Sequence, residues 1–269
     1  MKSILTVMVI LLFAGCQKQA STKLAPLKFE DVVLENKSKD EEVTKRASER
    51  RKKCPIGNPN CQPQPPDPPQ PPPPTGSAGC ILLDCDGQEV ANTLWNVSGD
   101  FYSQPSGLSS TAIADVLNKC RIYYAFNEGI NITTDESVFN SFPINKRIRV
   151  IITSTMPEGY QGAGGVAYIN SFNWYEDAPC FVNSSGLSGN PKYIADASSH
   201  EAGHTLNLRH HPELRYNEDG SCYVYSSYLW GDLIMGASYY SASPRFDIAP
   251  TDCTLMQNDT LIINQSIRL

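Results

Sequence analysis

The chain has 269 residues and a formal net charge of −6, and hydrophobic residues make up 41% of it. This length and apolar content suffice for a compact domain with its own core. The acidic balance, without a basic patch inside that domain, argues against nucleic acid as a partner.

The first residues are typical of a secretion signal. Lys2 is followed by an apolar run over positions 4–14, too short to span a bilayer, and then by Gly15 and Cys16. This end of the chain resembles a bacterial lipoprotein signal. The resemblance implies that residues 1–15 are removed, that Cys16 carries lipid, and that this anchor is the protein's only membrane contact. The expected location is the cell envelope, at the outer membrane or cell surface, facing the periplasm or the exterior. An ordinary signal peptide cut nearby is the alternative.

Residues 16–75 read as a lipid anchor followed by a charged segment and a spacer. The charged segment, residues 17–53, ends in the basic run 50–53, and eleven of the twenty residues 55–74 are proline. Proline at this density favours an extended polyproline II spacer of about 3.1 Å per residue, or roughly 60 Å in all. Disorder is the expected state of residues 17–53. The alternative is a pro-segment that masks the active site and is cut at the basic run.

Residues 76–269 read as one compact α+β domain. Apolar periodicity and turn residues predict its elements in chain order. Helices are expected over 109–126 and 191–208, and strands over 131–139, 147–153, 165–169 and 180–182. A loop-rich region and a last helix over 246–261 are expected to follow.

All four histidines of the chain lie between positions 200 and 211. Residues i and i+4 of a helix share one face, so His200 and His204 can reach one cation. Glu201 is rotated by about 100° from His200, which places its carboxylate beside the metal, where it can take a proton from water. The segment therefore predicts a metal site with an adjacent base.

A third ligand must come from beyond the helix. The spacing favours His210, and His211 beside it is the alternative. Because a straight helix would carry position 210 away from the metal, the chain must bend after His204.

These residues resemble the motif of metzincin zinc endopeptidases, His-Glu-x-x-His-x-x-Gly-x-x-His, with Asn207 in place of the glycine. The resemblance places the bend at Asn207, and asparagine tolerates the left-handed backbone conformation that such a bend needs. Met235, in a turn of small residues, is similar to the family's Met-turn beneath the metal. The resemblance implies Zn²⁺ bound by the three histidines of the motif, with Glu201 as the catalytic base. It also implies a metzincin-like fold, with a twisted mixed β-sheet, a backing helix, an active-site helix and a small loop-rich C-terminal subdomain that ends in a helix.

Two further expectations follow from the resemblance. The strand nearest the cleft, with Gly165, Val166 and Ala167, would bind an extended protein or peptide substrate by strand addition, although an ordinary edge strand would look the same. Some metzincins use a tyrosine after the Met-turn as a further ligand or oxyanion donor. Tyr239 and Tyr240 lie near that place.

The chain contains nine cysteines. Without the lipidated Cys16 eight remain, an even number, in a chain bound for an oxidising compartment. They are therefore interpreted as disulfides rather than metal ligands. Cys54 and Cys61 are close enough in sequence to pair with each other, and the connectivity of the other six stays open.

The leading hypothesis is a lipid-anchored, monomeric zinc endopeptidase. The alternatives are a surface binding module that keeps the zinc fold without useful activity, and a surface-anchored interaction protein with a chance motif. Glu201 favours the first, because zinc binding alone needs no base. The pocket beside Met235 depends on the loops around it, so the sequence does not define the substrate.

Overall fold

The computed structural model describes residues 32–34 and 72–268. The predictions for the signal, Cys16, the basic run and the proline-rich spacer lie outside the described residues, as do Cys54 and Cys61. None of the helices within residues 72–268 combines the length and the apolar character of a membrane span.

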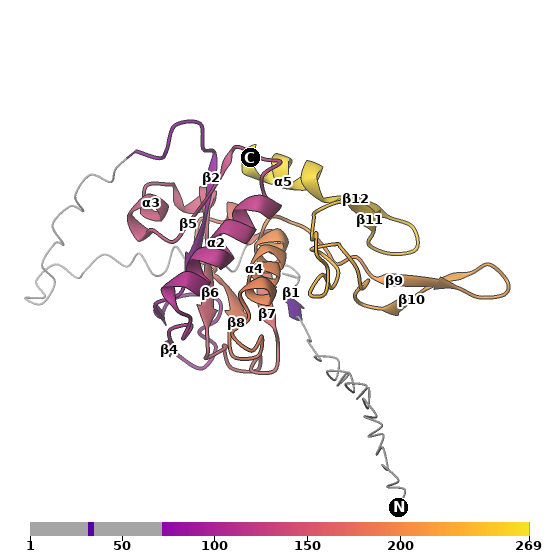
Figure 1. The fold of residues 1–269 in the computed structure, drawn as a ribbon, viewed down its shortest axis with the longest axis horizontal. Coiled ribbons are helices and arrows are strands. Elements are labelled where there is room, and N and C mark those ends of the chain that lie inside the picture. Colours follow the sequence, from indigo (N-terminus) through magenta and orange to yellow (C-terminus); the bar gives the residue numbers. More distant parts are fainter. Residues whose placement is uncertain (1–31, 35–71, 269) are drawn as a thin grey trace, which may run out of the picture.

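One mixed, mostly parallel sheet organises the described part of the chain (Figure 1). Its strand order is β1-β7-β8-β6-β2-β5, and all neighbours are parallel except the antiparallel pair β7 and β8. The strands are β1 (Val32–Leu34), β2 (Gly79–Asp84), β5 (Ile130–Thr133), β6 (Arg147–Thr153), β7 (Gly165–Tyr168) and β8 (Cys180–Asn183). The predicted α+β class with a mixed sheet is confirmed.

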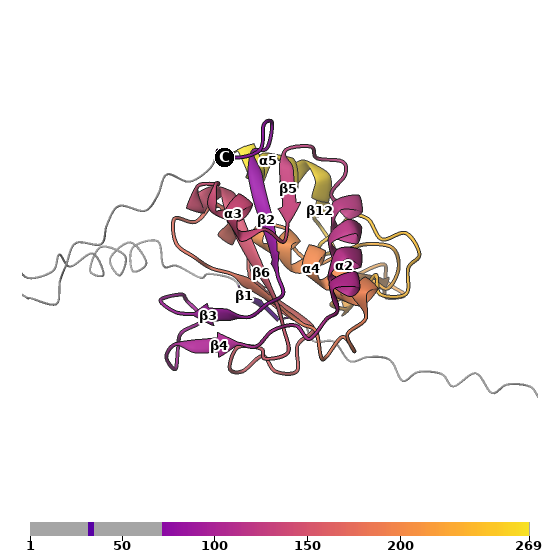
Figure 2. The ribbon, with the colours of Figure 1, turned by 60° about the vertical axis from the view of Figure 1, so that its left-hand side comes forward.

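Both faces of the sheet are covered, which explains why every residue of β2 is buried. One face carries the helices α2 (Ser110–Tyr123) and α4 (Pro191–Thr205). The opposite face carries α3 (Glu136–Asn140) and a hairpin of β3 (Gln88–Val90) and β4 (Phe101–Ser103) (Figure 2). The short 3-10 helix η1 (Ile144–Lys146) precedes β6. Side chains alternate between the two cores, because successive residues of a strand point to opposite faces.

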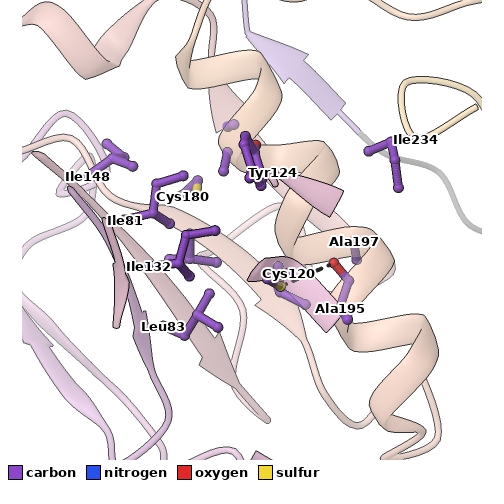
Figure 3. Close-up of a cluster of buried hydrophobic side chains, with 14 of the residues drawn as sticks. Ile81, Leu83, Cys120, Tyr124, Ile132, Ile148, Cys180, Ala195, Ala197 and Ile234 are labelled. Carbon is purple, nitrogen blue, oxygen red and sulfur yellow. Dashed lines mark hydrogen bonds between the residues drawn. The ribbon is translucent and has the colours of Figure 1, made fainter. Parts of the chain in front are cut away.

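The core under the helices is the larger one. Ile81, Leu83 and Ile132 project from neighbouring strands toward Cys120 of α2 and Tyr124 at its end (Figure 3). Cys120 Sγ donates to the carbonyl of Ala195 on α4, and Tyr124 donates its hydroxyl to the carbonyl of Ser199. These contacts fix α2 against α4, the helix that carries the histidine motif.

Local capping explains where α2 and α4 begin. The Ser109 side chain accepts from Ala112 N, and Asn190 accepts from Lys192 N and Tyr193 N. Pro191 takes the first position of α4, where its missing N–H costs nothing. Both helices were predicted from the sequence, and α4 ends three residues earlier than expected.

Two predicted elements were wrong. The strand expected over 131–139 ends with β5, because the Asp135 side chain accepts from Ser137 N and Val138 N and starts α3. The helix expected over 246–261 is instead a hairpin of β11 (Ile248–Pro250) and β12 (Met256–Asn258), followed by α5 (Asp259–Arg268). Asp252 at the hairpin turn accepts from Thr254 N and Leu255 N, which stabilises the turn rather than a helix.

The cysteines also depart from the prediction. Cys222 and Cys253 form a disulfide that ties a second hairpin, β9 (Glu213–Tyr216) and β10 (Cys222–Ser226), to the loop before β12. Four other cysteines are free thiols in the described residues: Cys80, Cys85, Cys120 and Cys180. Three of the four are fully buried in the sheet and helix core, where a thiol packs as a small hydrophobic group.

The strand predicted to be the open edge is not the outermost one. β1 pairs in parallel with the outer side of β7, with Val32 opposite Val166 and Val33 opposite Ala167. β1 has only three residues and lies inside a polar segment. Its hydrophobic pattern is therefore too short to predict a strand from sequence.

Candidate metal centre

Three histidine side chains converge at the C-terminal end of α4. His204 Nε2 lies 3.0 Å from His200 Nε2 and 2.9 Å from His210 Nε2. The three form a group whose potential ligand atoms all lie within 4.8 Å of one another. His200 and His204 are buried on consecutive turns of α4, and His210 arrives from the loop that follows.

A left-handed turn brings His210 back to the helix. Asn207 has φ +75°, the conformation expected for it from the sequence. Its N–H donates to the carbonyl of His204, and the N–H of Leu208 donates to the carbonyl of Gly203. This is the Schellman pattern in which two orphan carbonyls of the last turn are satisfied as the chain reverses. Asparagine thus performs the bend that glycine makes in the related motif.

The ring tautomers leave the inner nitrogens available for a cation. His200 Nδ1 lies 2.6 Å from the carbonyl oxygen of Ile234, and His204 Nδ1 lies 2.8 Å from that of Leu208. A carbonyl only accepts, so both Nδ1 atoms carry hydrogen and both Nε2 atoms present lone pairs to each other. Lone pairs about 3 Å apart repel unless a cation lies between them, and three neutral imidazoles are a ligand set that suits Zn²⁺.

Burial keeps His204 and His210 neutral. Burial is the main cause that lowers the pKa of His204 well below its ordinary value, and the neighbouring His200 and His210 add to the effect. Burial likewise lowers the pKa of His210 to about 2, with further contributions from His200 and His211. A neutral imidazole is the form that binds a metal, so protons do not compete for His204 and His210 at neutral pH.

Glu201 lies between α4 and β7 and is fully buried. A Cβ atom at position 165 would be only 2.4 Å from Glu201 Oε1. Because Gly165 has no side chain, the Glu201 carboxylate can occupy this space. The predicted substrate strand, β7, and the predicted base, Glu201, are therefore in direct contact. The sequence identified both residues, but it did not indicate that one depends on the other.

Met235 lies beneath the histidine-bearing helix, where the sequence placed a Met-turn. It is fully buried, and a Cβ at Gly203 would be 2.7 Å from its sulfur. The preceding residue, Ile234, supplies the carbonyl that holds His200, and the Met235 carbonyl accepts from the N–H of His211. The turn thus orients the ring of His200 and holds the backbone at His211.

His211 does not join the group. Its Nε2 lies 3.0 Å from both carboxylate oxygens of Asp259, and its Nδ1 lies 3.0 Å from the carbonyl of Pro250. Both His211 and Asp259 are fully buried. Of the two alternatives for a third ligand, the structure brings His210 to the pair and uses His211 to attach α5 and the β11–β12 hairpin.

A tyrosine that the sequence did not single out lies beside the histidines. The ring centroid of Tyr228 is 4.6 Å from that of His210 and 6.5 Å from that of His200. Tyr239, by contrast, packs edge-on against Tyr193 in the first turn of α4, with centroids 5.5 Å apart. Tyr228 lies upstream of the Met-turn, so the spacing of the related motif could not indicate it.

Tyr228 is held in place by its neighbours. Leu229 N donates to the carbonyl of His211 over 2.7 Å, and the carbonyl of Leu229 accepts from Ala237 N over 2.9 Å. The Ser226 hydroxyl accepts from the N–H of Tyr228 and donates to the carbonyl of Tyr228. The tyrosine is therefore fixed beside His210, in a segment bonded on one side to His211 and on the other to Ala237.

No protein-family model matches this chain, and no curated protein matches it either. The three-histidine group, Glu201 and the turn at Met235 are therefore interpreted from their own geometry.

Proposed function

We propose that this protein is a zinc-dependent endopeptidase of the metzincin type, secreted and held at the bacterial cell envelope by a lipid on Cys16. The observation that carries the proposal is the convergence of three neutral imidazoles beside a buried glutamate, Glu201. Metal binding alone would need only the imidazoles, so the adjacent carboxylate supports hydrolysis.

Each residue of the group has a role in that chemistry. His200, His204 and His210 would hold Zn²⁺, which supplies Lewis acidity and makes water nucleophilic near neutral pH. Glu201 would take the proton from the attacking water and pass it to the leaving amine. Tyr228, whose ring packs against that of His210, would donate its hydroxyl to the oxygen on which negative charge develops.

The substrate class follows from the strand beside the base. A protein or peptide in extended form could pair with β7, whose Gly165 touches the base, and place a peptide bond near the histidines. Because β1 now pairs with the outer side of β7, such a substrate would have to replace it. Because the chain is acidic, we expect no nucleic acid among its partners. We also expect the protein to be a monomer.

The proposal is tested with the full chain and its Glu201→Gln variant, using zinc stoichiometry and cleavage of a random peptide pool. One zinc per chain in both, with cleavage only by the native chain, is the expected result. Glu218→Gln, the same chemical change at an exposed turn, is the matched control and should cleave normally. Zinc without cleavage in the native chain would favour a binding module, and absence of zinc would refute the proposal.

A further inference from the structure

A groove lies on the face of the sheet opposite α4, beside the β3–β4 hairpin (Figure 2). Its volume is about 570 Å³, within the range of ligand sites in proteins. One wall comes from β4 and the loop before it, and the other from the loop that joins β6 to β7. Five of its lining residues are aromatic: Trp95, Phe101, Tyr102, Tyr160 and Tyr168. We call this site the aromatic groove.

The rings of the aromatic groove form a fixed surface. Trp95 donates its indole N–H to the carbonyl of Pro179 over 2.7 Å. Its ring lies 4.5 Å from that of Tyr168 and 5.8 Å from that of Tyr160, measured between centroids. Tyr102 is 49% exposed, so part of the aromatic surface is open to a ligand. A cation placed over the face of such a ring is attracted by its π electrons.

The charge at the aromatic groove has one sign. Asp100 and Glu158 belong to its lining and are exposed, and no lysine, arginine or histidine among the described residues lines it. A positively charged side chain with an apolar stem therefore complements both the rings and the carboxylates. Arginine and lysine are side chains of this kind, and the guanidinium of arginine also stacks on aromatic faces.

Tyr168 connects the aromatic groove to β7, the strand proposed to bind substrate. Val166 belongs to the same hydrophobic cluster as Trp95, on the groove side of the sheet. Gly165 and Ala167, by contrast, face the α4 side. A substrate strand paired with β7 would alternate in the same way, so every second side chain would point toward the groove side.

We propose that the aromatic groove binds an arginine or lysine side chain of the extended substrate. This inference rests on the proposed function, because it assigns the groove to the same peptide that pairs with β7. Gly165 touches the proposed base, Glu201, and Tyr168 lies three residues further along the strand. Three residues of strand span about 10 Å. The basic residue would therefore lie about three positions from the cleaved bond, on the face of the substrate that points away from Glu201.

The first test measures binding without cleavage, using the full-length Glu201→Gln chain in the presence of zinc. The probes are fluorescent alanine–serine peptides with one arginine, and the same peptides with citrulline, which keeps the shape of arginine but carries no charge. We expect the arginine peptide to bind about fivefold more tightly. This difference should disappear when Asp100→Asn and Glu158→Gln are added. It should persist with Glu128→Gln and Glu218→Gln, which remove the same charge at exposed positions outside the groove.

The second test uses the native full chain and a random peptide pool, with the cleaved bonds identified by mass spectrometry. Arginine and lysine should be enriched at one position, about three residues from the cleaved bond. Replacing both groove carboxylates with lysine, as Asp100→Lys and Glu158→Lys, should change this preference to aspartate and glutamate.

The outcomes separate the groove from the proposed function. Equal affinity for the arginine and citrulline peptides would overturn the proposal even if the native chain cleaves peptides. A preference that survives the loss of Asp100 and Glu158 would overturn it too, as would cleavage without enrichment of basic residues at the expected position. A native chain that does not cleave, but prefers arginine through these two carboxylates, would support the groove's chemistry and refute the proposed function.

Discussion

Gly165→Ala is expected to displace the Glu201 carboxylate while leaving the histidines in place. The added carbon would lie 2.4, 2.6 and 2.7 Å from Oε1, Cγ and Cδ of Glu201, whereas ordinary contact begins at 3.4 Å. Gly165 is held in β7 opposite Val182, so the glutamate side chain must move, by about 1 Å. A misplacement of about 1 Å costs on the order of 10²-fold in rate.

Three measurements on the full chain separate the effects of this change. Peptide hydrolysis should fall on the order of 10²-fold. Zinc stoichiometry should stay at one per chain, and the free energy of unfolding should fall by about 1–3 kcal/mol from overpacking. Gly162→Ala is the matched control, because a Cβ there meets nothing within 4 Å, and it should leave all three quantities unchanged.

Hydrolysis by Gly165→Ala within about threefold of the native rate would refute the reasoning, since the base would then tolerate displacement. Loss of zinc together with activity would refute it in another way. It would show that the added carbon also disturbs the histidine group, so that Glu201 cannot be displaced without changing the histidines.

Three further predictions concern stability and reactivity. Gly203→Ala should lower the free energy of unfolding in urea by about 1–3 kcal/mol, because its Cβ would lie 2.7 Å from the Met235 sulfur, and an unchanged midpoint would contradict that close packing. His211→Ala should cost about 3–5 kcal/mol in the same assay, because it leaves the buried Asp259 carboxylate without its imidazole partner. A cost below about 1 kcal/mol would show that the pair does not stabilise the fold. Burial raises the pKa of the Cys120 thiol to about 12, so only about 10⁻⁴ of it is thiolate at pH 8. Iodoacetamide followed by mass spectrometry should therefore label Cys120 in urea but not in the native chain, and rapid native labelling would argue against this burial.

The group of three histidines was the part of the structure best predicted from sequence. Periodicity placed His200 and His204 on one helix, and the tolerance of asparagine for positive φ predicted the bend at Asn207. The contacts of Gly165 with Glu201 and of Tyr228 with His210 could not be predicted, because they join segments far apart in the chain through tertiary packing.

Local signals misled the prediction elsewhere. Pro250, which suits the first turn of a helix, suggested a helix over 246–261, but Pro250 pairs with Met256 in the β11–β12 hairpin. The true start of α5 was marked by Asn258, whose side chain accepts from Leu261 N. β2, whose six residues are all buried, was missed because a short apolar run has no periodicity to identify it.

The pairing of the cysteines was unpredictable for a different reason. An even count is compatible with full oxidation or with several buried thiols, and only the distances between side chains decide. Cys80, Cys120 and Cys180 are buried and reduced, while Cys222 pairs with Cys253.

The disulfide has a consequence for the metal site. Its two cysteines are 31 residues apart, and the loop between them contains Tyr228 and Met235. Closing a loop of this length removes about 4 kcal/mol of conformational freedom from the unfolded chain. The cost of ordering the turn beneath the histidines is therefore lower in the oxidised chain than in the reduced one. For the zinc proposed at the histidine group, thiol redox state and affinity would thus be thermodynamically linked, and we expect reduction to raise the zinc concentration needed to fill the site.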